Sequence, residues 1–171
     1  MNTKTTPLLH SLPFTQANTY LFSFLFVAGN ILLPQLCHLV PGGGPMLLPI
    51  YFFTLIAGYK FGIRVGLITA LLSPVINHLL FGMPAMAVLP AILLKSGLLA
   101  LAAACAARYM NKVSIGALLV VVLSYQVVGT LGEWALSGSL YIALQDFRMA
   151  IPGLLIQWLG GYALLKAIAR W

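Results

Sequence analysis

Residues 84–108 read PAMAVLPAILLKSGLLALAAACAAR, and the class of this protein follows from them. The interior of the run is apolar apart from Ser96 and one cation, Lys95, near the middle. A helix of this length spans roughly 30 Å of hydrocarbon. A lone ammonium group at that depth costs at least about 2.5 kcal/mol, so such a residue usually faces a partner, a water-filled cavity or a ligand. The run therefore predicts a membrane helix with a functional lysine.

The composition of the whole chain supports a membrane protein. Of 171 residues, 61% are hydrophobic and only 6% are charged. A soluble domain of this size could not bury so much apolar surface. Backbone groups in lipid must be paired within the protein, so the sequence predicts an all-α membrane protein that folds as one compact bundle.

Six apolar segments predict six transmembrane helices in a single domain, residues 1–171. Residues 1–17 precede the first of them. The second segment is short, so a tilted or broken span is expected there. The predicted spans are about 18–40, 46–59, 63–82, 85–107, 113–134 and 147–169.

The cations between these spans predict the orientation. With the N-terminus in the cytoplasm, Arg148 is the single cation on the outer side, at the mouth of the last span, and Lys95 is buried. Short cytoplasmic loops are enriched in Lys and Arg, so both termini are expected to be cytoplasmic, in the cell inner membrane. The cations on the cytoplasmic side would be Lys4, Lys60, Arg64, Arg108, Lys112, Lys166 and Arg170.

Two glycine patterns have alternative interpretations. Gly42, Gly43 and Gly44 lie in the first outer loop, where they form either a turn between helices or a mobile gate. The second pattern recurs every four residues and would form a smooth helical stripe. That stripe either packs inside the bundle or docks on a separate membrane subunit. Its members are Gly58, Gly62, Gly66 and Ala70.

Polar side chains inside the predicted spans lie at the midplane or in the outer half of the membrane. They are expected to converge on a cavity that opens outward, which suits the capture of a solute. A continuous channel would need polar lining on both sides. The predicted substrate-binding residues are Lys95, Asn30, Asn77, His78, Gln126, Glu133, Arg148, Gln157 and Trp158.

Several of these residues have a structural alternative. Lys95 either forms an ion pair with Glu133 or contacts a ligand, with Glu133 as a counter-ion. Asn30 and Gln157 either bind ligand or join helices through hydrogen bonds. His78 could bind ligand, cap its helix or lie at the membrane interface.

Trp158 and Arg148, both in the last predicted span, also have a structural alternative to ligand binding. Trp158 could belong to an aromatic belt at the membrane surface or stack on a ligand ring. Arg148 could anchor the helix at the surface or attract an anion.

Enzymatic function is not predicted. No His, Cys, Asp or Glu cluster has metal-ligand spacing, and no serine has an obvious base on its own helix. The glycine-rich loop lacks the Lys and Ser/Thr of a phosphate-binding loop. No metal, cofactor or nucleic acid is expected.

Residues 48–108 resemble the substrate-binding S components of energy-coupling factor (ECF) vitamin transporters. The resemblance rests on the AGYKFG turn at residues 57–62, the SPxxN element at 73–77, GMP at 82–84 and LP at 89–90. It implies a vitamin or cofactor precursor held beneath the first two outer loops. It also implies a membrane coupling protein and two cytosolic ATPase subunits as partners.

Two further expectations concern the ligand and the alternatives to this family. Many members carry an acid where this chain has Lys95, which favours an anionic ligand such as pantothenate or lipoate over thiamin. A stand-alone secondary transporter is the main alternative, although no repeat between the two halves is evident. A small membrane enzyme is a weaker one.

Overall fold

The computed structural model describes residues 11–168, except for the side chain of Asp146, so Lys4 and Arg170 lie outside the described residues. Every regular element in this range is helical. In chain order these elements are α1 (Ala17–Cys37), α2 (Gly43–Leu47), η1 (Pro49–Tyr51), α3 (Phe52–Phe61), α4 (Ile63–Phe81), α5 (Leu89–Met110), α6 (Ile115–Ser137), α7 (Leu140–Met149), α8 (Ile151–Leu155), η2 (Ile156–Gly160) and α9 (Gly161–Ile168).

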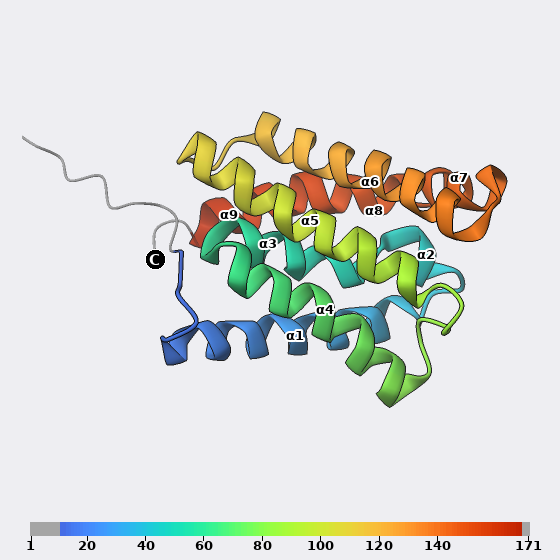
Figure 1. Cartoon of the computed structure of the whole chain (residues 1–171), viewed down its shortest axis with the longest axis horizontal. Helices are drawn as coiled ribbons and strands as arrows, with labels where there is room; N and C mark the ends of the chain where they lie inside the picture. The colour runs from blue at the N-terminus through green and yellow to red at the C-terminus, as the bar shows by residue number, and fades with distance from the viewer. Residues whose placement is uncertain (1–10, 169–171) are drawn as a thin grey trace, which may run out of the picture.

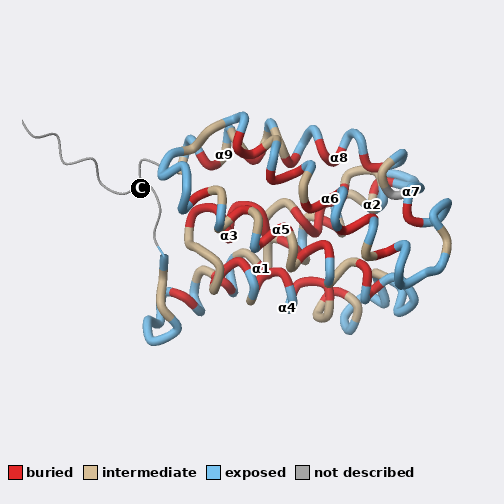
Figure 2. Tube along the Cα trace, turned by 45° about the horizontal axis from the view of Figure 1, so that its top comes forward, coloured by how far each residue is buried: buried red, intermediate tan, exposed pale blue. Residues whose placement is uncertain are grey.

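Within residues 11–168, five helical segments are long and apolar enough to cross a membrane. They are α1, α4, α5, α6 and the continuous segment Ile151–Ile168. Their outward faces expose large apolar side chains, among them Phe24 at 70%, Leu79 at 74% and Val120 at 67% (Figure 2). Soluble proteins rarely expose apolar surface on this scale. The chain is therefore an all-α, multi-pass membrane protein.

The second predicted span is broken, as its length suggested. The chain turns at Leu48, whose φ of 47° lies in the left-handed region, and Pro49 then begins the short 3-10 turn η1. Pro49 has no N–H to continue the preceding helix. The helix that follows, α3, has only 10 residues, or about 15 Å of length.

Two other boundaries differ from the sequence prediction. Helix α5 begins at Leu89 rather than near 85, because Pro90 is tolerated only in the first turn of a helix. The segment 82–88 is therefore a loop. Helix α6 extends to Ser137 and ends at Gly138, whose φ of 69° suits a glycine at a helix C-terminus.

Helix α7 occupies the region predicted as the third outer loop. It is a short amphipathic helix that exposes Tyr141 and Ile142 and buries Ala143. The sequence predicts residues 135–146 as a connection between the fifth and sixth spans. The apolar face was overlooked because it spans fewer residues than a membrane helix requires.

The connecting segments divide the bundle into two ends. Figure 1 shows α2, α7 and the loop 82–88 at one end, which we call the α2 end; the start of α1 and the end of α9 lie at the opposite end. Arg148, in the last turn of α7, lies at the α2 end. The cations Lys60, Arg64, Arg108, Lys112 and Lys166 belong to elements that meet at the opposite end.

The glycine stripe packs inside the bundle. A Cβ at Gly58 would lie 2.9 Å from the backbone oxygen of Ala100, and a Cβ at Gly66 would lie 2.8 Å from the Cα of Gly58. Ala70 is fully buried, and Gly62 ends α3 with a φ of 87° beside Ser11. These residues let the backbones of α3, α4 and α5 approach closely. The geometry matches the interpretation in which the stripe packs inside the bundle, and docking on a separate subunit stays a prediction.

We predict that Gly66→Ala lowers the free energy of unfolding by about 1–3 kcal/mol, because the added methyl group must displace the backbone at Gly58. Gly97→Ala is the control, since a Cβ there meets no atom within 4 Å. The control should be neutral or slightly stabilising. Thermal unfolding of the detergent-solubilised protein measures both, and equal effects would contradict the close packing.

Candidate functional site

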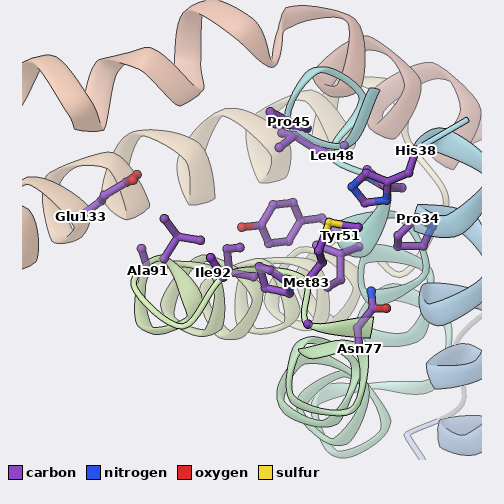
Figure 3. Close-up of a pocket in the computed structure, with 17 residues that line it drawn as sticks. Pro34, His38, Pro45, Leu48, Tyr51, Asn77, Met83, Ala91, Ile92 and Glu133 are labelled. Atoms are coloured by element: carbon purple, nitrogen blue, oxygen red, sulfur yellow. The ribbon is translucent and has the colours of Figure 1, made fainter. Parts of the chain in front are cut away.

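A cavity of about 440 Å³ lies at the α2 end of the bundle (Figure 3). Its wall is built by six parts of the chain: the last turns of α1, the α2–η1 segment, the end of α4, the loop 82–88, the start of α5 and Glu133 of α6. Its volume lies within the range of 300–1,000 Å³ typical of small-molecule sites. The breaks at Leu48 and before Leu89 shape this cavity, since continuous helices there would leave no loops to form its rim.

Most of the lining is apolar. Pro34 comes from α1, Leu48 from the broken segment, Met83 from the loop and Ile92 from α5. The ring of Tyr51 stands among them, with its hydroxyl directed toward the side of Ala91 (Figure 3). Such a lining would bind the apolar body of a ligand by excluding water from it.

A hydrogen bond from His78 holds the loop 82–88 in place at the rim of the cavity. The Nδ1 of His78 donates to the carbonyl oxygen of Pro84 at 2.8 Å, which ties α4 to the loop 82–88. His78 therefore supports the cavity without being part of its wall.

The three glycines predicted as a turn or a gate begin α2. Gly42 has a φ of 75°, and the N–H of Gly43 donates to Val40 at 2.9 Å. A side chain at Gly43 would overlap the carbonyl of Cys37, and Gly44 lies against His38. The described geometry is that of a closely packed turn, and the gate hypothesis stays a prediction.

Polar groups occupy the two sides of the cavity. Figure 3 places Glu133 on one side and His38 and Asn77 on the other, with the apolar residues between them. Asn77 is 2% exposed, and its Oδ1 accepts from the Nε2 of Gln35 at 3.1 Å. The amide nitrogen Nδ2 of Asn77 is the atom of this side chain that can donate a hydrogen bond to a molecule in the cavity. The cavity therefore offers polar groups at both ends of an apolar space.

Lys95 and Glu133 form a buried ion pair that joins α5 to α6. The Nζ of Lys95 lies 2.5 Å from Oε2 of Glu133, and the two side chains are 1% and 9% exposed. Gly129 makes room for the lysine stem, since a Cβ there would lie 2.5 Å from Cγ of Lys95. Glu133 is part of the cavity wall, whereas Lys95, one helical turn after Ala91 in α5, is not. The predicted pair is present, and contact between Lys95 and a ligand stays a prediction.

Asn30 joins three helices and does not line the cavity. Its Nδ2 donates to Thr54 at 3.0 Å and to Ser73 at 3.2 Å, and its Oδ1 accepts from the N–H of Phe53 at 3.1 Å. Asn30 is fully buried, so its whole amide is used by the protein. The geometry matches the alternative in which Asn30 connects helices through hydrogen bonds.

Gln157 and Trp158 also make internal contacts. The hydroxyl of Tyr125 donates to Oε1 of Gln157 at 2.8 Å, and Nε1 of Trp158 donates to the carbonyl of Ile115 at 2.8 Å. Both residues lie in η2, a π-helical turn, and both contacts attach it to α6. Neither side chain belongs to the wall of the cavity.

Gln126 and Arg148 lie outside the cavity wall as well. Gln126 is 1% exposed, and neither its Oε1 nor its Nε2 has a hydrogen-bond partner among the described residues. It lies two turns below Glu133 on the same face of α6. Arg148 is exposed in the last turn of α7.

Sequence reasoning missed most of the wall. Pro34, Tyr51, Met83 and Ile92 carry no charge or amide, so nothing in an apolar sequence distinguishes them from lipid-facing residues. The usable signal was the position of proline and glycine, since each loop that forms the rim contains both. His38, which is not among the predicted binding residues, is also part of the wall.

Among the described residues, the titratable side chains in the cavity wall are those of His38, Tyr51 and Glu133. Among residues 11–168, no set of three or more His, Cys, Asp or Glu side chains could hold a metal ion. The carboxylate in the cavity wall is held by Lys95.

Comparison of the chain with protein-family models, with curated proteins and with solved structures finds no match.

We predict that Lys95→Met destabilises the protein by about 3–5 kcal/mol, because it leaves the Glu133 carboxylate buried without its cation. The double variant Lys95→Met/Glu133→Gln should recover most of that loss, since no charge then remains unpaired. Thermal unfolding in detergent provides the double-mutant cycle. Additive losses from the two substitutions would contradict a coupled pair.

Proposed function

We propose that this protein is the substrate-binding S component of an ECF-type importer. It would capture a vitamin or cofactor precursor from outside the cell inner membrane. One observation carries the proposal: a largely apolar cavity of about 440 Å³, with polar groups on both sides, lies beneath loops at one end of a membrane bundle. The resemblance of residues 48–108 to that family predicts a ligand in this position.

The distribution of cations supports the proposed orientation. The cavity lies at the α2 end, whereas Lys60, Arg64 and Lys112 lie toward the other. Cytoplasmic loops are enriched in Lys and Arg, so the α2 end would face outward and both termini would face the cytoplasm. In this orientation, η1 and α3 together would form one further span, the shortest, which brings the number of spans to six.

The far side of the cavity is closed by packed side chains, which supports capture rather than conduction. Leu55, Tyr59, Leu99 and Leu118 form a fully buried core below it. The hydroxyl of Tyr59 donates to the carbonyl of Lys112 at 2.8 Å and so closes the opposite end. Release on the cytoplasmic side would need a large rearrangement, which a coupling protein and two ATPase subunits would drive.

We predict that the protein purified in mild detergent contains about one small molecule per chain, detected by mass spectrometry after denaturation. Ala91→Trp should reduce this content at least tenfold, because Ala91 lines the cavity and is 9% exposed. Leu101→Trp, on the lipid-facing side of the same helix, is the matched control. A folded Ala91→Trp protein with undiminished content would contradict the site; Ala91→Leu serves if the larger change prevents folding.

We further predict that uptake into liposomes requires ATP and the coupling subunits. The chain alone should give no uptake above that of protein-free vesicles. Accumulation by the chain alone under a proton gradient would instead identify a secondary transporter.

A further inference from the structure

The carboxylate of Glu133 forms part of the cavity wall. Lys95, whose amine lies 2.5 Å from Oε2 of Glu133, is not part of the wall. A molecule in the cavity therefore meets Glu133 before it meets Lys95. The sequence favours an anionic ligand because Lys95 is expected to contact it. Since Glu133 and not Lys95 is part of the wall, this argument for an anionic ligand is weakened.

The carboxylate can still accept a hydrogen bond. Lys95 occupies Oε2, so Oε1 is the oxygen left to accept from a donor in the cavity. A carboxylate accepts and cannot donate while it is ionised. An N–H or O–H group is therefore favoured at this end, and a negatively charged group is repelled.

The other end of the cavity provides complementary groups. Asn77 is 2% exposed, and its Oδ1 is occupied by Gln35, which leaves the amide nitrogen to donate. The imidazole of His38 lies on the same side of the cavity (Figure 3). An acceptor, such as a carbonyl oxygen or a ring nitrogen, is favoured at this end.

We infer that the ligand is an uncharged, largely apolar molecule with a hydrogen-bond donor at the Glu133 end and an acceptor at the Asn77 end. The inference rests on the proposed function. Lys95 is then a positioning residue: it fixes the carboxylate and balances its charge, and it does not touch the ligand. Carboxamide or alcohol forms of a vitamin fit this description, and free carboxylic acids do not.

The first test determines the charge at pH 7 of the molecule released by denaturing the purified protein, by capillary electrophoresis. A neutral molecule supports the inference, and an anion overturns it. If no molecule is released, the purified protein is titrated with matched pairs: pantothenol and pantothenate, lipoamide and lipoate, nicotinamide and nicotinate. The uncharged member of the binding pair should bind at least tenfold more tightly, measured by the thermal shift. Tighter binding of the acid overturns the inference.

Failure of the proposed function is a separate result. It would appear as no released molecule together with no thermal shift from any member of the three pairs, and the inference would fall with it.

The second test separates the role of Glu133 from a structural one. Glu133→Gln keeps the shape of the side chain and removes its charge, so the preference for the uncharged member should fall at least tenfold. A merely structural role would weaken both members equally. The double variant Lys95→Met/Glu133→Gln should bind the uncharged member within a few-fold of the single Glu133→Gln variant. A further large loss would show that Lys95 contacts the ligand and would overturn its assignment as a positioning residue.

Discussion

The ion pair between Lys95 and Glu133 is the interaction on which the rest of the bundle depends. Each charge alone would be unstable among apolar helices, and together they fix the register of α5 against α6. That register sets the depth of the carboxylate and therefore the end of the cavity. Gly129 allows this packing of α5 against α6, because only a residue without a side chain leaves room for the lysine stem.

A second set of polar contacts connects other pairs of helical elements. Asn30 links α1 to α3 and α4, and the hydroxyl of Tyr125 links α6 to the π-helical turn η2. Hydrophobic burial does not drive helix association within lipid, so such contacts contribute specificity to the packing. The polar residues of the spans thus divide into one group that orders the bundle and one that borders the cavity.

The sequence predicts the membrane class and most span positions, because long apolar runs such as those of α1 and α4 leave no other choice. It also anticipates the pairing of Lys95 with Glu133, since the chain has only two acids. It does not predict which neutral polar residues face the cavity. The partners of Asn30 lie 24 and 43 residues away, and the rotation of each helix about its axis decides whether they meet. The left-handed turn at Leu48 is equally invisible, because that backbone conformation is rare for leucine.

The contacts of Gly58 and Gly66 have a mechanical consequence. Helices that touch backbone to backbone cannot slide past one another without breaking many contacts at once, so α3, α4 and α5 behave as one rigid slab. Under the proposed function, a molecule that enters or leaves the cavity would pass between this slab and the two segments at its edge, residues 38–48 and 82–88. The hinges of such a movement would be the left-handed positions Gly42, Leu48 and Gly82, where the chain already changes direction.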